Sequence, residues 1–334
     1  MPNEWAATRR FLIAITLPRV GGQRSFSRSH GGFVLGSITL LIALMTASAA
    51  ERQPEERKRS NFSTRFAGEY RYQTSSDLKA GTNFEVERFV SQASLAYRPS
   101  PRRSLSLSLS YSRDAYDIAV PNAAGGFNPW GEIDTVGLSL PIIWGLADRW
   151  TLLGLPMIRG TAESGADWGD AITGGGIVGV SYRVSDSLSI GPGLGLLTQL
   201  EDRVNPFPVL VVDWTVADRW TLATGRGLGA AQGPGLLLSY AASETWTLLL
   251  GGRYERFRFR LRGNGAVPDG VGEDRGLPLS LGARYRWNRV ATLTCFAGVN
   301  AAGRILVEDA SGSDLFSSNY DPAPFFGAMA SFRF

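Results

Sequence analysis

Histidine, cysteine and lysine are almost absent from this chain of 334 residues, which contains one histidine and one cysteine. The lone Cys295 excludes a disulfide-stabilised scaffold, because each disulfide needs two cysteines. His30 lies in an N-terminal stretch that we expect to be cleaved, and Lys58 and Lys79 are the only lysines. The remaining chain therefore has no imidazole for acid–base chemistry or metal binding. We expect no catalytic residue, no metal, no cofactor and no enzymatic activity.

Positive charge is in excess, with 34 lysines and arginines against 30 acidic residues and a net charge of +4. The excess lies in residues 1–49, where five arginines oppose Glu4. The rest of the chain carries 29 basic and 29 acidic residues and is neutral. Nucleic-acid-binding domains usually present a basic surface, so this balance argues against a nucleic-acid partner.

The N-terminal 49 residues have the features of an export signal. Residues 33–45 (FVLGSITLLIALM) carry no charge, and Ala47-Ser48-Ala49 follows as a small-residue cleavage pattern. The apolar run is shorter than the roughly 20 residues that a membrane-spanning helix needs. We expect export and cleavage near Ala49/Ala50. Residues 50–64 are polar and highly charged, and we expect them to form a flexible periplasmic segment before a folded domain over 65–334.

From Arg65 onward apolar residues recur at every second position, which is the pattern of a strand with two different faces. Between Ser104 and Tyr111, leucines and a tyrosine at odd positions alternate with serines at even positions. A similar alternation runs from Leu277 to Trp287. Successive strand side chains point to opposite faces, so each of these segments has one apolar and one polar face.

Short turn signals separate the strands at regular intervals. They lie at residues 99–101, 147–149, 185–187, 217–219, 242–244 and 288–289, and longer polar or glycine-rich stretches alternate with them. The strands that flank these turns, with a first and a last strand, number about fourteen, and 12–16 are compatible with the pattern. An even-stranded up-and-down meander places both ends of the domain and every tight turn at the same end.

Aromatic residues gather near the tight turns. The set comprises Tyr97, Trp144, Trp150, Tyr182, Trp214, Trp220, Tyr240, Trp246 and Trp287. Tryptophan and tyrosine rings favour the lipid headgroup zone and form girdles around transmembrane barrels. Only helices and closed barrels satisfy every backbone group in lipid, and no mature segment is a spanning helix. We therefore expect an all-β fold, a closed antiparallel up-and-down transmembrane β-barrel with this set as its periplasmic aromatic girdle.

The C-terminal strand ends in an aromatic residue. Ala328, Ala330, Phe332 and Phe334 share one face of an apolar last strand. This ending resembles the signal by which bacterial outer-membrane β-barrel proteins are recognised for assembly, although Gly327 lies farther from the end than the usual glycine. Residues 65–334 resemble porin-like and uncharacterised outer-membrane barrel families in architecture. The resemblance implies a bacterial outer-membrane location, contact with outer-membrane lipid, and recognition of Phe332 and Phe334 by the barrel-assembly machinery.

Polar residues at alternate strand positions are candidates to line the lumen. They are Glu69, Arg71, Gln73, Gln92, Ser94, Ser106, Ser108, Ser110, Arg253, Ser280 and Arg284. Mixed charges and hydroxyls suit a water-filled interior. They suit equally an internal hydrogen-bonded network that fills the barrel without conduction.

An arginine-rich segment spans residues 253–262, with arginine at positions 253, 256, 258, 260 and 262. Two interpretations stay open: a basic ladder that faces the interior and attracts anions, or a solvated strand extension above the membrane. The inward ladder requires a β-bulge near Glu255, because the apolar face that begins at Trp246 continues to Arg256.

The most direct functional hypothesis is a porin-like channel or transporter for small polar solutes. The alternative is a non-conducting barrel with a structural or surface-interaction role, whose long outer loops bind a partner. The glycine-rich string 174–179 matches a dinucleotide-binding pattern, but a strand-like Val180-Ser181-Tyr182 follows where that fold needs a helix. We assign these glycines to strand bends and expect no bound cofactor.

Overall fold

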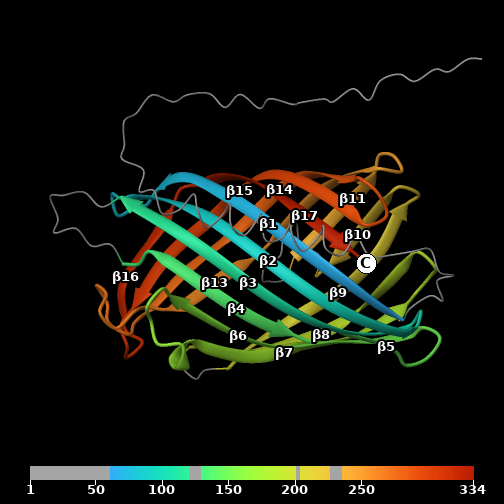
Figure 1. The fold of residues 1–334 in the computed structure, drawn as a ribbon, viewed down its shortest axis with the longest axis horizontal. Helices are drawn as coiled ribbons and strands as arrows, with labels where there is room; N and C mark the ends of the chain where they lie inside the picture. The colour runs from blue at the N-terminus through green and yellow to red at the C-terminus, as the bar shows by residue number, and fades with distance from the viewer. Residues whose placement is uncertain (1–60, 120–128, 201–203, 226–234) are drawn as a thin grey trace, which may run out of the picture. The chain divides into compact units, whose positions relative to one another are not determined.

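A computed structural model describes residues 61–119, 129–200, 204–225 and 235–334 of the chain (Figure 1). The predicted leader 1–49 and its cleavage site lie outside the described residues, as does most of the predicted polar segment 50–64. The first strand begins at Phe62. Residues 62–64 therefore belong to the sheet and not to the polar segment in which we predicted them, because Phe62 pairs with Tyr97 on the next strand.

The described chain is almost entirely β-structure. Its strand segments are β1 (Phe62–Asp77), β2 (Asn83–Ser100), β3 (Arg103–Ala119), β4 (Glu132–Ser139), β5 (Ile142–Gly145), β6 (Trp150–Glu163), β7 (Ile172–Arg183), β8 (Leu188–Thr198), β9 (Val204–Ala217), β10 (Trp220–Thr224), β11 (Gly235–Ala241), β12 (Trp246–Arg253), β13 (Glu255–Arg260), β14 (Val271–Arg286), β15 (Ala291–Glu308), β16 (Asp314–Tyr320) and β17 (Ala323–Arg333). A short 3-10 helix, η2 (Gly169–Ala171), precedes β7. Among the described residues, no helix is long and apolar enough to cross a membrane.

Three strands are interrupted, so the seventeen segments make fourteen strands. Leu140-Pro141 separates β4 from β5, and both halves lie between β3 and β6. Asp321-Pro322 separates β16 from β17, which both pair with β15. Proline lacks the N–H that a ladder needs, which explains these two breaks. Tyr254 separates β12 from β13, and both pair with β14.

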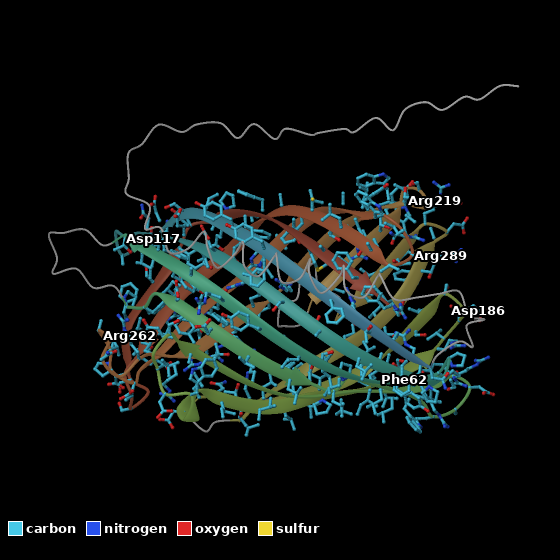
Figure 2. All side chains as sticks on the ribbon, in the orientation of Figure 1. Phe62, Asp117, Asp186, Arg219, Arg262 and Arg289 are labelled. Carbon is cyan, nitrogen blue, oxygen red and sulfur yellow. The ribbon has the colours of Figure 1, made fainter. Side chains whose placement is uncertain are left out.

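The sheet closes on itself between its first and last strands. β1 pairs with β17 from Arg65↔Arg333 to Gln73↔Phe325, and each remaining wall strand pairs antiparallel with the strands before and after it. The predicted closed antiparallel up-and-down barrel of about fourteen strands is therefore confirmed. The tight turns also share one end, because Figure 2 labels Asp186, Arg219 and Arg289 there with Phe62, and Asp117 and Arg262 at the opposite end. We call these the turn end and the outer end.

The outward face of the barrel is a continuous apolar belt. On β3, Leu105, Leu107 and Leu109 are exposed, whereas Ser108 between them is buried. The belt continues around the barrel through Leu95, Val136, Leu138, Ile158, Val178, Leu194, Leu210, Leu236, Leu248, Leu250, Leu279, Leu281, Leu293 and Phe326, all exposed. On β3, the outward-facing leucines are followed toward the outer end by Tyr111 and then by Arg113, which forms an ion pair with Asp134 at 2.8 Å. Charged residues therefore mark the outer border of the belt.

β13 leaves the wall and crosses to the other side of the barrel. β12 pairs with β11 as far as Arg253↔Gly235. Beyond this point β13 pairs with β14 on one edge and meets β6, in parallel, at Arg260↔Ala162 on the other. Figure 1 shows β13 at the end of the barrel where β16 also lies. In the described residues the outer end is thus a smaller ring that omits β7 to β11.

An apolar core fills this smaller ring. Its buried members are Leu78, Phe84, Val86, Tyr116, Trp130, Ile133, Phe259, Leu261, Val267, Ile305, Val307, Tyr320 and Ala323. They come from strands on both sides of β13, and Phe259 of β13 is fully buried at 0% exposure between Trp130 and Tyr116. The barrel therefore has its hydrophobic core at one end, where β13 supplies the apolar side chains that close it.

Candidate functional site

The predicted aromatic girdle lies around the turn end. Tyr97, Trp144, Trp150, Trp214, Trp220, Trp246 and Trp287 are exposed, and Tyr182 and Tyr240 are half-buried. Several rings pair across neighbouring strands in register, with centroids 4.8 Å apart for Trp150 and Tyr182 and 4.7 Å for Trp220 and Tyr240. Such pairs stabilise a sheet by packing on one face. The arrangement therefore gives one rim of the apolar belt an amphipathic border.

Two further rings join this rim. Tyr285 packs against Trp246 with centroids 4.9 Å apart, and Phe62 packs against Tyr97 at 4.8 Å. The sequence pattern indicated neither, because Phe62 fell in the polar segment and Tyr285 was assigned only to its strand. At the end of the last strand, Phe332 pairs in register with Phe66 on β1. The ring of Phe334 also lies edge-on to Phe66, with centroids 6.4 Å apart.

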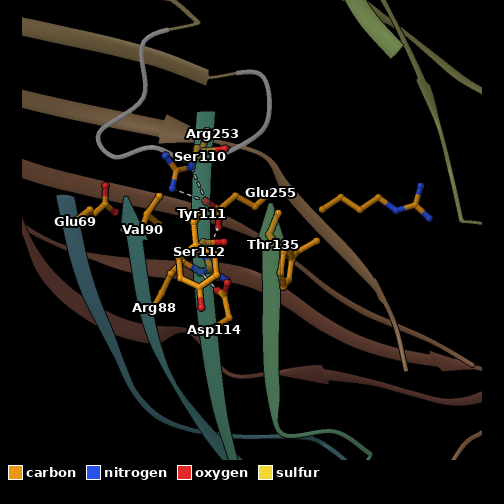
Figure 3. Close-up of a pocket in the computed structure, with 12 residues that line it drawn as sticks. Glu69, Arg88, Val90, Ser110, Tyr111, Ser112, Asp114, Thr135, Arg253 and Glu255 are labelled. Atoms are coloured by element: carbon orange, nitrogen blue, oxygen red, sulfur yellow. Dashed lines mark hydrogen bonds and ion pairs between the residues drawn. The ribbon is translucent and has the colours of Figure 1, made fainter. Parts of the chain in front are cut away.

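Three arginines converge on one carboxylate inside the outer ring. Glu255 accepts hydrogen bonds from Arg253 Nε at 2.6 Å and from Arg71 Nη2 at 3.4 Å, and Arg88 Nη1 lies 3.7 Å away. Arg88 also donates to Asp114, which is 1% exposed. Figure 3 shows Arg88, Asp114, Arg253 and Glu255 of this cluster, which line a small pocket of about 60 Å³. Buried charges need such partners, because an unpaired buried ion is costly.

A second polar cluster lies beyond it, around Asp274. Tyr116 and Tyr320 donate their hydroxyl protons to the two oxygens of this carboxylate, each at 3.0 Å. Asn300 donates to the Tyr320 hydroxyl at 2.7 Å and to Gln73 Oε1 at 3.3 Å. Residues of β1, β3, β14, β15 and β16 are thereby joined in one network inside the ring.

Asp274 lies outside the apolar belt, which on β14 ends at Leu277. Burial raises the pKa of Asp274 from 3.8 to about 6, although Arg88 and the two tyrosine hydroxyls oppose this shift. Burial and the nearby Asp274 charge also raise the pKa of both Tyr116 and Tyr320. Both phenols therefore remain protonated donors at any ordinary pH.

The predicted lumen residues fall into two groups. Glu69, Arg71, Gln73 and Arg253 are buried within or beside the outer-ring network. The others lie on the inward face, at the level of this network or closer to the turn end. Gln92 and Ser110 line a large interior cavity, and Ser280 borders a smaller one. Ser94 and Ser108 share a hydrogen bond of 2.8 Å, Ser106 continues their row, and Arg284 Nε donates to Thr294 at 3.4 Å. The packed-network interpretation thus describes the outer part of the barrel.

The solvated extension does not describe the arginine-rich segment, and the inward interpretation describes it in part, because Arg253 and Arg258 are buried inside the barrel. The strand is interrupted at Tyr254, next to the expected bulge, and β13 then turns inward. Arg258 donates to Glu273 at 2.7 Å and to Glu308 at 2.5 Å. Arg260 donates to backbone carbonyls of Asp170 and Leu200, which lie on the far side of the barrel. The arginines therefore hold the closed outer end together.

The large interior cavity lies below the outer ring and has a volume of about 740 Å³. One side is apolar, with Leu155, Met157, Ile177, Leu197, Phe207 and Val209 from β6 to β9. The other side carries polar groups, with Gln92, Ser110, Ser139, Arg159 and Arg253. Drug-sized ligands bind in cavities of about 300–1,000 Å³ with mostly apolar walls and a few polar groups. The cavity has the size and lining of a site for a small molecule.

Arg159 is the charged group of this lining that the sequence pattern did not single out. It faces the interior from β6, opposite Gly137 on β4 and Thr173 on β7. A Cβ on Gly137 would lie 2.8 Å from Ser110 Oγ and 3.8 Å from Arg159 Cβ, so this glycine lets the two side chains approach. The available signal was alternation, because residues 153–159 place Leu153, Leu155, Met157 and then Arg159 on one face.

No protein-family model matches the chain, and no curated protein matches its sequence. Solved structures with a similar fold include an outer membrane channel from Pseudomonas putida F1, with 8% identity, 84% of this chain and 100% of that chain covered, and a TM-score of 0.47. The translocator domain of autotransporter NalP from Neisseria meningitidis has 12% identity, covers 91% and 98%, and has a TM-score of 0.37. The P. putida toluene transporter TodX has 8% identity, covers 82% and 89%, and has a TM-score of 0.40.

Proposed function

We propose that this protein spans the bacterial outer membrane and transfers small solutes through its interior. The observation that carries the proposal is the combination of an outward apolar belt, bordered by paired aromatic rings, with a large interior cavity. A soluble protein rarely exposes so extensive an apolar surface, whereas lipid requires it. The cavity supplies the space that a solute needs inside the barrel.

Fractionation tests the membrane location. We expect the full chain, expressed in a Gram-negative host, to be recovered with the outer membrane and to require detergent for extraction. In this proposal the leader directs export and the C-terminal strand directs insertion into the outer membrane. We therefore expect cleavage near Ala49/Ala50 and assembly that depends on Phe332 and Phe334. Recovery of folded protein in the periplasm without detergent would contradict the proposal.

Conductance in a planar lipid bilayer tests the transfer of solutes. The outer ring is packed, so we expect small and infrequent openings in the natural sequence. Arg260→Ala removes the hydrogen bonds to the backbone carbonyls of Asp170 and Leu200 and should give larger or more frequent openings. Arg289→Ala, at the turn end, is the matched control and should leave conductance unchanged.

A non-conducting barrel with a surface-interaction role is the second candidate. The core and the two polar networks within the outer ring favour it, because they fill the interior at that end. Folded protein without openings in the natural sequence and in Arg260→Ala would support this second function. We also propose that the barrel is not an enzyme: Glu255 and Asp274, two carboxylates inside the outer ring, are engaged by arginines and tyrosines.

A further inference from the structure

We propose that the interior cavity binds an amphipathic organic anion, with its apolar body on the β6–β9 wall and its carboxylate on Arg159. This inference rests on the proposed function, because it names the class of solute that the barrel takes up. It differs from the small polar solutes that the sequence pattern suggested.

The β6–β9 wall is apolar on both faces. Leu155 and Ile177 are cross-strand partners that face the cavity, while Val178, which follows Ile177, is exposed on the belt. A wall between lipid and water needs apolar residues only on its outer face. The inward apolar side chains therefore indicate an interior surface that favours contact with an apolar body.

Phe207 is the largest apolar side chain of this wall. Its register partner on β8 is Gly195, and a Cβ on Gly195 would collide with the Phe207 ring. The glycine thus lets the ring lie flat along the wall, next to Val209 and Leu197 in the cavity lining. A flat aromatic surface offers a large area for burial of an apolar ligand.

Arg159 supplies one positive charge at the border of this wall. It is half-buried, and among the described residues no carboxylate forms an ion pair with its guanidinium. Its inward neighbours along β6 are Met157 and Thr161. A guanidinium in such surroundings favours an anion, and its planar geometry suits two hydrogen bonds to a carboxylate.

The other polar groups complete the site for a carboxylate. Ser110 lies next to Arg159 across Gly137, and Gln92 is the register partner of Ser110 on β2. A hydroxyl and a side-chain amide each donate to a carboxylate oxygen. A fully polar solute would leave its own groups unpaired along the β6–β9 wall, which costs free energy. One charged head and one apolar body therefore match the two sides of the cavity.

Binding of 4-phenylbutyrate to the full barrel in lipid nanodiscs, measured by calorimetry, tests this inference. The neutral probe of the same shape is 4-phenylbutyramide. We expect phenylbutyrate to bind about tenfold more tightly than the amide, because hydrogen bonds to charged groups are the stronger ones. Arg159→Gln should remove this preference, whereas Arg159→Lys should keep most of it.

The matched control is Arg284→Gln, since Arg284 is an inward arginine that does not line the cavity. It should leave both affinities unchanged. Phe207→Ala should weaken both probes equally, because it removes apolar contact and not charge. Folding of each variant is checked by its resistance to unfolding in unheated SDS gels.

Equal affinity of the two probes, or no effect of Arg159→Gln, would overturn the inference. Failure of phenylbutyrate to bind would overturn it as well. Bilayer openings that persist in the same protein would show that the proposed transfer of solutes still stands. Loss of both binding and openings, in folded protein, would contradict the two proposals together.

Discussion

The side chains of Arg71 and Glu255 lie 184 positions apart in the sequence and meet at 3.4 Å inside the barrel. Arg71 projects from β1, and Glu255 begins β13, the segment that leaves the wall. The contact exists only because β13 turns inward after Tyr254. Glu255 therefore lies at the point where β13 leaves the wall, in contact with the opposite strand β1.

Replacing Glu255 should destabilise the outer ring strongly. Glu255→Gln keeps the size of the side chain and leaves Arg71, Arg88 and Arg253 without a shared negative charge. Breaking a buried ion pair by removal of one partner costs about 3–5 kcal/mol. We expect a loss of this order in the free energy of unfolding, measured by urea titration of the barrel in detergent.

The matched control for this change is Glu244→Gln at the turn end. Glu244 is exposed, so its loss should alter stability by no more than about 0.5 kcal/mol. Equal effects of the two substitutions would contradict the role that we assign to Glu255.

Asp274 should make the outer ring less stable as the pH rises. Its pKa in the folded barrel is about 6, above the ordinary value of 3.8. The folded state therefore holds this proton between about pH 4 and pH 6 when the unfolded chain has released it. The stabilising contribution is complete below pH 4 and is lost as the pH passes through 6.

Asp274→Asn tests this dependence, because the amide cannot ionise. We expect the variant to lose less stability than the natural protein between pH 4 and pH 7, in unfolding titrations at each pH. Glu308→Gln, which removes a different carboxylate of the ring, serves as the control. It should lose stability between pH 4 and pH 7 as the natural protein does. A pH profile unchanged by Asp274→Asn would contradict the assignment.

The architecture could be predicted from alternation and turns, because both are local properties of the chain. The serine and leucine rows of β3 and the turns near Asp186, Arg219 and Arg289 fix strand number and direction. The outer ends could not be predicted equally well. β16 (Asp314–Tyr320) lies in one of the longer polar stretches that alternate with the tight turns, and its pairing with β15 is set by contacts beyond the apolar belt.

The interior was harder to predict than the wall. Alternation placed Glu69, Arg71 and Gln73 on the buried face, but it could not show that Glu255 and Asn300 meet them from distant strands. The departure of β13 depends on the break at Tyr254 and on carbonyls near Asp170. Such long-range contacts leave no periodic signal in the sequence.

Paired aromatic rings at the turn end should be energetically coupled. Trp220 and Tyr240 are register partners with ring centroids 4.7 Å apart. A double-mutant cycle with Trp220→Ala and Tyr240→Ala should give a coupling energy of about 0.5–1.5 kcal/mol. The unpaired combination of Trp220→Ala with Trp150→Ala should be additive, because these rings belong to different pairs. Additivity in both cycles would show that the girdle contributes through single rings only.

The crossing of β13 to β6 predicts a specific disulfide. Ala162 and Arg260 are Cα register partners, and neighbouring strand positions of this kind lie within the Cα separation that a disulfide spans. In a Cys295→Ser background, Ala162→Cys with Arg260→Cys should cross-link on mild oxidation, as measured by mass spectrometry of the digested protein. The pair Ala162→Cys with Arg219→Cys should stay reduced, because Arg219 lies at the turn end, opposite to Arg262. If β13 instead stayed in the wall beside β11, the first pair would also remain reduced. Cross-linking of the first pair alone therefore distinguishes a closed outer ring from a simple open cylinder.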